Sequence, residues 1–315
     1  MIDIFGKPET PQSIVTLTLN PTIDTAFEAD EVKPTQKTRT FDERVDPGGG
    51  GINVARVLQR FGAEPRALFL GGGHTGHLLD RLLGREGVER EGIEIDGDTR
   101  LSVTVFDRST GCEYRFVPEG PQVLEREWIA CLDRVRMRRC DWFVASGSLP
   151  RGVPDDFYGR VRDALPSQAK YVVDSSGAEL RAALEHGGIY LAKPNHSELE
   201  ELAGRPLSDQ EQIAEAASEL VSSGACEFVA VTLGRDGAIL AGKSGVQFAD
   251  APQVPSKSAV GAGDSFLAGL VFGLSRNMEP AAALSLAVAA GAASTLSPGT
   301  GLCLRDDVEQ LLQGV

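Results

Sequence analysis

Residues 256–274 read SKSAVGAGDSFLAGLVFGL, and this stretch carries most of the information about the fold. Gly261 and Gly263 form a glycine-rich turn that leads directly into a long apolar helix, expected over Asp264–Leu274. Glycines let backbone amides approach an anion closely, and a helix N-terminus adds the positive end of its dipole. The turn therefore suits a phosphoryl group, and Asp264 could accept a proton from an attacking hydroxyl. On these residues alone, a plain N-cap role for Asp264 explains the segment equally well.

Outside this segment, short apolar runs alternate with stretches of helical periodicity. The expected strands are SIVTLTL at 13–19, RALFL at 66–70, WFVAS at 142–146, YVVDSS at 171–176, IYLAKP at 189–194 and FVAVTLG at 228–234. The expected helices lie at 52–61, 77–85, 155–165, 197–203, 210–222, 280–296 and 305–312. This alternation indicates a three-layer α/β fold, in which helices cover both faces of a mainly parallel sheet. Ligands of such sheets bind beyond the carboxyl ends of the strands.

The chain is expected to form one domain over residues 13–315, because it has no internal repeat and no low-complexity linker. Residues 1–12 are polar, contain two prolines, and are expected to be a loosely held leader. Residues 22–46 and the strands expected near 101–117 carry many charges and few large aliphatic side chains. Strands of this kind belong at an edge or in a small separate sheet, which predicts a β-flap over the main domain.

Bulk properties exclude several classes of protein. The 315 residues carry a formal net charge of −14, which argues against nucleic acid or an anionic membrane as a partner. No apolar run reaches the roughly 20 residues that a membrane-spanning helix needs, and the start lacks a signal-peptide pattern. The five cysteines form no CxxC pair, which favours reduced thiols and a cytoplasmic enzyme.

Four glycines precede the first helix, within the sequence DPGGGGINVAR at 46–56. Consecutive glycines are entropically costly unless the backbone must come close to something. The segment is interpreted as a sugar-binding loop in which Asn53 hydrogen-bonds hydroxyls, and a flexible hinge is the alternative. Asp24, in LNPTID at 19–24, follows the first strand and could bind a pair of sugar hydroxyls, although an Asp after Pro is also common in turns.

Two further strand ends and a set of basic residues are weaker signals. In KPNHSE at 193–198, Asn195 and Glu198 could hold magnesium through water, but their spacing favours a helix-capping box. TLGRDG at 232–237 could lie under a nucleotide, but a hairpin turn is the default. The flap carries basic residues that could bind phosphate or simply be solvated: Lys37, Arg39, Arg100 and Arg115.

Other glycine-rich folds lack support. There is no GxxxxGK[ST] loop, no protein-kinase HRD or DFG set, and no GxGxxG after the first strand. The serines of the SGS turn at 146–148 follow a predicted strand and are interpreted as a binding turn.

Taken together, these segments make the chain from Ser13 onward resemble the ribokinase-like (PfkB) family of carbohydrate kinases. The resemblance rests on GGGGINVAR, KPNHSE, TLGRDG and, above all, SAVGAGDSFLAG. Within the family, LTLNPTIDTA, EYRFVPEG, SGSLPRGV and VVDSSGAEL are most similar to the PfkB-type 6-phosphofructokinases. The 1-phosphofructokinase and tagatose-6-phosphate kinase groups usually have Lys where this chain has Gly50. The resemblance therefore favours fructose 6-phosphate as the substrate, with the other two activities as alternatives and a non-catalytic sugar-phosphate sensor as a distant one.

The resemblance also implies roles for individual residues. Asp264 would be the catalytic base, beside an anion hole formed by Gly261, Ala262 and Gly263. Sugar-binding residues would be Asp24, Gly49, Gly50, Asn53 and Ser148. The substrate phosphate would contact Arg100, Arg115 and, from the flap of a second subunit, Lys37. ATP would contact Lys193, Asn195, Thr232, Gly234 and Gly237.

The resemblance further implies Mg²⁺, possible K⁺ and a homodimer held together by the flaps. Mg²⁺ would lie near Glu198 and Asn195, mostly through water. A monovalent cation such as K⁺ would lie near Ser258, Val260, Ser294 and Gly299. Gly301 stands where the nearest relatives are expected to have Arg, which leaves the geometry of the cation loop open.

Overall fold

A computed structural model describes residues 4–6, 10–256, 258–297, 299 and 301–314 of the chain. The short apolar runs form a large central sheet. Its strands, in spatial order, are β13 (Gly245–Ala249), β12 (Ala238–Gly242), β11 (Cys226–Thr232), β10 (Ile189–Ala192), β9 (Lys170–Asp174), β8 (Trp142–Ser146), β1 (Ile14–Thr18), β4 (Arg66–Gly71) and β5 (Glu89–Glu94). Every pairing from β11 to β5 is parallel, and β12 and β13 extend the sheet in antiparallel fashion. The prediction of a mainly parallel sheet is confirmed.

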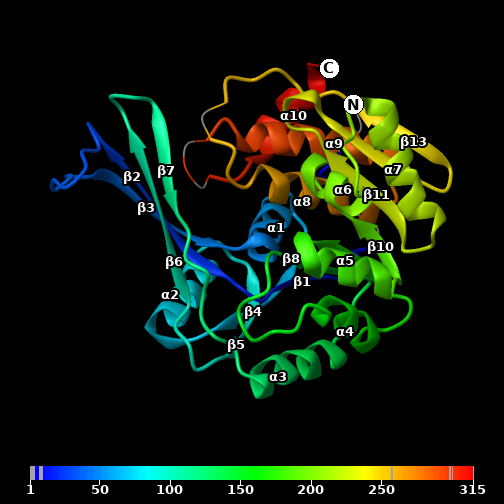
Figure 1. Cartoon of the computed structure of the whole chain (residues 1–315), viewed down its shortest axis with the longest axis horizontal. Helices are drawn as coiled ribbons and strands as arrows, with labels where there is room; N and C mark the ends of the chain where they lie inside the picture. The colour runs from blue at the N-terminus through cyan, green and yellow to red at the C-terminus, as the bar shows by residue number, and fades with distance from the viewer. Residues whose placement is uncertain (1–3, 7–9, 257, 298, 300, 315) are drawn as a thin grey trace.

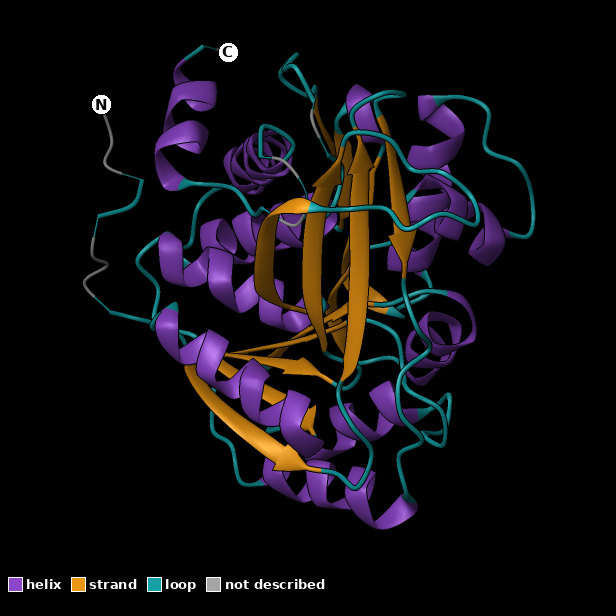
Figure 2. Ribbon diagram, turned by 90° about the vertical axis from the view of Figure 1, so that its left-hand side faces the viewer, coloured by secondary structure: helices purple, strands orange, loops and turns teal. Residues whose placement is uncertain are grey.

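Helices cover both faces of this sheet (Figures 1 and 2). One layer contains α3 (Glu125–Arg136), α4 (Phe157–Ala164), α5 (Gly177–His186), α6 (His196–Ala203) and α7 (Gln210–Ser222). The other contains α1 (Gly50–Arg60), α8 (Ala262–Ser275), α9 (Pro280–Ser294) and α10 (Arg305–Gln313). Alternate residues of β8 divide between the two cores, because Phe143 faces the first layer and Trp142 and Val144 face the second. The three-layer prediction is therefore confirmed.

A second, four-stranded sheet projects from one side of the molecule as the flap (Figure 1). Its strands are, in spatial order, β3 (Phe41–Gly48), β2 (Thr22–Ala29), β6 (Arg100–Asp107) and β7 (Cys112–Phe116). The central β2–β6 pair is parallel and the outer pairs are antiparallel. Helix α2 (Gly73–Arg85) packs at the root of the flap, where Leu79 meets Ile23 and Ile52 in a small separate core.

Three helices begin earlier than their sequences suggest. Helix α1 begins at Gly50, α2 at Gly73 and α8 at Ala262, in each case within a glycine-rich turn. Glycine has a poor helix propensity, but tertiary packing decides these starts. Strands β5 and β13 and helices α3 and α5 had no counterpart among the expected elements. β5 reads EREGIE, and only one of its residues is buried, so its sequence carries no strand signal.

The beginning of the chain also differs from the expected loose leader. Phe5 is buried and its ring packs on Phe61 and Phe272, with centroid separations of 5.0 and 5.4 Å. Arg276 donates a hydrogen bond to the carbonyl of Ile4. A single aromatic side chain thus anchors residues 4–6 between α1 and α8. No helix in the described ranges is long and apolar enough to cross a membrane, and all five cysteines are free thiols.

Candidate active site

A cavity of about 390 Å³ lies where the flap meets the carboxyl ends of the central strands. Residues at and after the ends of β8 and β9 contribute to its wall, together with the flap strands β2, β6 and β7 and the beginnings of α1 and α8. Of the residues singled out from the sequence, the cavity brings together Asp24, Gly49, Gly50, Asn53, Arg100, Arg115, Ser148, Glu198, Val260, Gly261 and Asp264. The cavity is also lined by Ser146, which belongs to the expected binding turn, and by residues to which the sequence gave no role, among them Ser102 and Asp174.

Asp264 occupies the third position of α8, and Gly261 is the N-cap, in the left-handed conformation that favours glycine. The N-cap interpretation of Asp264 is therefore wrong. Its Oδ2 accepts a hydrogen bond of 2.8 Å from Nδ2 of Asn53. Burial and the nearby carboxylate of Asp174 raise the pKa of Asp264 to about 6, although Asn53 and Lys193 oppose this shift. A carboxylate with such a pKa is poised to exchange a proton near neutral pH.

This pKa predicts a pH dependence. The base works only when its carboxylate is ionised. Because its pKa is raised above the ordinary value of 3.8, the carboxylate becomes protonated, and inactive as a base, at a higher pH. We expect kcat/KM for the sugar to fall about tenfold for each pH unit below the folded-state pKa of about 6. This fall, the acidic limb of the pH profile, is measured from initial rates in buffers of constant ionic strength. Circular dichroism at each pH verifies that the protein is folded. A flat profile down to pH of about 4.5 would contradict it.

The four-glycine run is a packed turn, so the flexible-hinge interpretation is wrong. A Cβ atom added to Gly50 would lie 2.2 Å from Oγ of Ser146, and one added to Gly51 would lie 2.5 Å from the carbonyl oxygen of Leu17. Both distances are far below contact distance, so the glycines allow α1 to begin directly against β1 and β8. This close approach brings Asn53 to Asp264.

The opposite wall of the cavity is formed by the flap. Burial raises the pKa of Asp24, against the effects of a hydrogen bond from Thr22 and the charges of Arg115, Arg56 and Arg100. The Arg100 guanidinium donates to the carbonyls of Pro118 (2.8 Å) and Asn20 (2.9 Å). The flap thus presents one partly buried carboxylate and two guanidinium groups to the same space, a set suited to hydroxyls and a phosphate.

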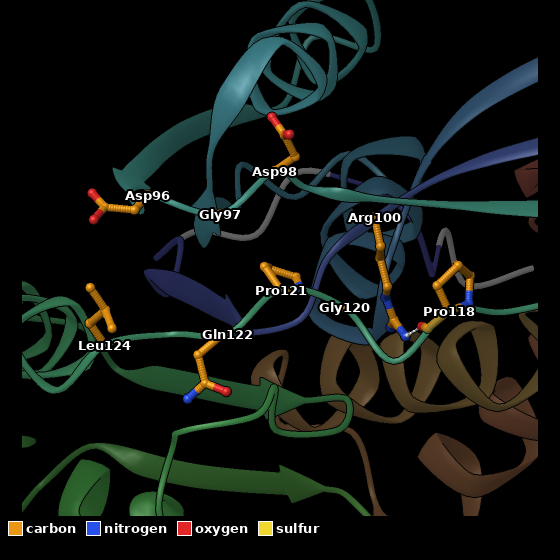
Figure 3. A pocket seen from close by; sticks show the side chains of 9 residues that line it. All are labelled: Asp96, Gly97, Asp98, Arg100, Pro118, Gly120, Pro121, Gln122 and Leu124. Carbon is orange, nitrogen blue, oxygen red and sulfur yellow. Dashed lines mark hydrogen bonds between the residues drawn. The ribbon is translucent and has the colours of Figure 1, made fainter.

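Arg100 also borders a second, open hollow between residues 96–98 and 118–124 (Figure 3). The figure shows its side chain pointing at the Pro118 carbonyl, away from Asp96 and Asp98. Asn20 holds the same segment from the other side, because its Nδ2 donates to the carbonyl of Glu119 and to Oγ of Ser148. Arg100 therefore supports the root of the flap as well as bordering the cavity.

The structure adds Asp174 to the site. This residue ends β9, and its carboxylate accepts from Nζ of Lys193 at 2.9 Å and from Oγ of Ser146 at 3.0 Å. Burial alone would lower the pKa of Lys193, but the charge and hydrogen bond of Asp174 outweigh it and raise that pKa. The signal in the sequence was the acidic residue at the end of the run YVVD, the same signal that singled out Asp24.

Asn195 and Glu198 form the capping box that their spacing favours. The Glu198 amide donates to Oδ1 of Asn195 at 2.9 Å, and the Asn195 amide donates to Oε2 of Glu198 at 2.8 Å. Glu198 also borders the cavity, whereas Asn195 is not among its lining residues. Burial raises the pKa of Glu198.

The remaining candidates lie outside the lining of this cavity. Thr232, Gly234 and Gly237 form the predicted hairpin turn between β11 and β12, and Thr232 bridges to Asn195. Near the expected cation site, Ser258 Oγ accepts from the Val260 amide at 3.3 Å. The other expected cation residues lie on α9 and beside the flap, where the hydroxyl of Ser294 donates to Gly291 and Gly299 packs against Ala26. Lys37 is exposed, in the loop between β2 and β3.

A partly buried carboxylate at the glycine-rich start of a helix, facing hydroxyl- and phosphate-binding groups, defines a phosphotransferase acting on a sugar hydroxyl. The chain belongs to the pfkB family of carbohydrate kinases, whose model matches residues 17–307. It is 43% identical to the ATP-dependent 6-phosphofructokinase isozyme 2 of Mycobacterium tuberculosis, over 98% of this chain and 90% of that protein. Its identity with the 1-phosphofructokinase of Bacillus subtilis is 34%, over 96% and 98% of the two chains.

Solved structures show the same architecture. The phosphofructokinase-2 of Escherichia coli in complex with potassium superposes with a TM-score of 0.92 at 37% identity, covering 96% of this chain and 99% of that one. The same protein has been solved with fructose-6-phosphate and in a tetrameric inhibited form.

Proposed function

We propose that the protein is a 6-phosphofructokinase that transfers the γ-phosphoryl group of ATP to the C1 hydroxyl of fructose 6-phosphate. The observation that carries the proposal is the placement of Asp264, partly buried at the start of α8 and hydrogen-bonded to Asn53, in one cavity with Asp24, Arg100 and Arg115. High identity to enzymes named 6-phosphofructokinase supports the choice of sugar.

In the proposed mechanism, this chain's residues position the reactants and stabilise charge. Asp24 and Asn53 bind sugar hydroxyls, while Arg100 and Arg115 bind the existing phosphate. Asp264 takes the proton of the attacking hydroxyl. The Ala262 amide donates to the carbonyl of Ala259 at 3.3 Å, whereas the next two amides, of Gly263 and Asp264, have no partner within the helix and would donate to the transferring phosphoryl oxygens.

Magnesium fits the nucleotide side of the cavity. Asp174 and Glu198 both border it with carboxylate oxygens, and the capping box uses only Oε2 of Glu198. No cluster of three or more acidic, His or Cys ligands occurs among the described residues, which suits a metal held largely by phosphates and water. Bound Mg²⁺ neutralises charge that develops on the phosphates. A potassium site near Ser258, Val260, Ser294 and Gly299 is part of the proposal, supported by the potassium complex of the Escherichia coli relative.

The identity of the sugar is the point that an assay must decide. The Bacillus subtilis relative is named a 1-phosphofructokinase, so fructose 1-phosphate is the second candidate, and tagatose 6-phosphate is the third. Gly50 favours fructose 6-phosphate because a longer side chain there would push against Ser146 and occupy the sugar side of the cavity.

We therefore expect fructose 6-phosphate to have the highest kcat/KM of the three sugars. The measurement is coupled ADP release with MgATP and potassium, and the Asp264→Asn variant serves as the blank. A pocket built to pair with a substrate's polar groups rejects the wrong isomer by about a hundredfold or more. If another sugar is preferred, the interpretation of Gly50 is wrong, while the family and the base remain.

A homodimer is also part of the proposal. Residues alternate between the two faces of the flap, and the face turned away from the cavity carries the cross-strand pairs Val103–Phe116 and Val105–Tyr114. The side chains exposed on this face include Leu101, Tyr114 and Phe116. A contiguous exposed apolar surface of this kind is unusual in a monomer. A second copy of the chain would cover this surface and could bring its own Lys37 to the cavity.

A further inference from the structure

A buried arginine connects the catalytic loop to the rest of the domain. Arg56 lies on α1 and is 2% exposed. Its Nη1 donates to the carbonyl of Pro47 at 2.7 Å and to Oδ1 of Asn53 at 3.3 Å, and its Nη2 is paired with Glu86. Burial opposes ionisation of Glu86, but the hydrogen bonds and charges of Arg56 and Arg60 outweigh it and lower the pKa of Glu86. The pair therefore stays charged.

This contact determines which end of the Asn53 amide faces the base. A carboxamide has one donor end and one acceptor end. Because Oδ1 accepts from Arg56, Nδ2 is left to donate to Asp264, at 2.8 Å. The reversed amide would place an oxygen against the carboxylate and an NH₂ group against the guanidinium, and both contacts would be repulsive.

Glu86 supports the same helix start from a second direction. Arg60, also paired with Glu86, donates to the carbonyls of Leu302 and Cys303 at 3.0 and 3.2 Å. The Leu302 side chain covers Gly261, since a Cβ atom added to this glycine would lie 2.6 Å from it. One carboxylate at the end of α2 thus holds two arginines that brace Asn53 and the α8 N-cap.

We propose that Arg56 is a positioning residue for phosphoryl transfer, which orients the Asn53 amide so that it donates to Asp264 and keeps this base ionised. Two carboxylates, Glu86 and Asp46, are paired with Nη2 of Arg56 and hold it in place. This inference rests on the proposed role of Asp264 as the base.

The other charged groups around Asp264 do not replace this contact. Asp174, at the end of β9, and Asp24, on β2, both favour protonation of Asp264. Lys193, after β10, favours its ionised form but is paired with Asp174 at 2.9 Å. Asn53 is therefore the group on α1 whose orientation tunes the base.

The decisive variant is Arg56→Lys, which keeps the positive charge beside Glu86 but loses the planar fork that reaches several acceptors at once. We expect the acidic limb of kcat/KM to move upward by about 0.5–1 pH unit, because a hydrogen bond to the charged form is weakened. We also expect kcat to fall about tenfold or more while KM for ATP changes less than about twofold. Arg56→Gln removes the charge as well and should shift the limb further.

Arg90→Gln is the matched control. It breaks another arginine–carboxylate pair to α2, with Asp80 at 2.9 Å; this pair is more exposed than the Arg56–Glu86 pair, and the hydrogen bonds of Arg90 go to Asp80 rather than to Asn53. The proposal would be overturned if both Arg56 variants had a lower melting temperature but the same acidic limb of kcat/KM as the wild type. Arg56 would then have a structural role only. A shift in Arg56→Gln but not in Arg56→Lys would also overturn it, because charge alone would be acting. An active Asp264→Asn variant would instead show that the proposed function has failed.

Discussion

Replacing Asp264 with Asn is expected to reduce kcat by about a hundredfold to ten-thousandfold, the range that a positioned general base contributes. The amide cannot take the proton of the attacking hydroxyl, but it has nearly the same shape. MgATP binding should remain within about twofold, because this carboxylate contacts the sugar side of the cavity. Coupled ADP release measures the rate, and titration calorimetry measures nucleotide binding.

Asp307→Asn provides a control matched in position. Asp307 lies in the first turn of α10 as Asp264 lies in the first turn of α8, so both changes remove a negative charge near a helix N-terminus. Asp307 does not border the cavity, and its variant should keep the wild-type rate. Turnover by Asp264→Asn at the wild-type rate would refute the base and, with it, the proposed mechanism.

The candidate residues that the structure brings into one cavity are mostly those with a local signal in the sequence. The turn before α8 and the run before α1 contain several glycines, which are unfavourable at a helix start unless the backbone must pass close to other groups. The structure shows such close approaches at Gly50 and Gly51. Asp24 was singled out because a carboxylate soon after a buried strand stands out, although the structure places it within β2 of the flap rather than at the end of β1. The parallel sheet was predictable because its strands are continuous apolar runs.

The residues that the sequence did not reveal depend on contacts between distant segments. Arg56 and Glu86 are 30 positions apart, and each taken alone resembles an ordinary helix residue. Nothing local indicates that Asn53 and Asp264, 211 positions apart, share a hydrogen bond. The burial of Phe5 was not predicted, because the N-terminal segment is polar overall and a single aromatic residue does not change that composition.

Lys37 gives the most specific test of the proposed dimer. Strand β2 leads away from the cavity over eight residues, from Thr22 to Ala29, and spans about 23 Å. Lys37 lies beyond it, in the loop between β2 and β3. Figure 1 shows this loop at the free end of the flap. A side chain there is far from the cavity of its own subunit, so a role in binding the substrate phosphate requires the partner's Lys37.

Mixing two defective variants should therefore restore activity. Lys37→Ala is expected to raise KM for the sugar phosphate by about tenfold or more, the cost of one charged hydrogen bond. In a mixed dimer with Asp264→Asn, one site has an intact base together with an intact Lys37 from its partner. Half of randomly formed dimers are mixed, and one of the two sites in each mixed dimer is intact. Refolded mixtures should therefore recover about one quarter of wild-type activity, measured at sugar concentrations well below the KM of the Lys37 variant. Arg39→Ala, which removes a positive charge from the same exposed loop, serves as the matched comparison. A mixture no more active than the mean of its two components would show that Lys37 does not act between subunits.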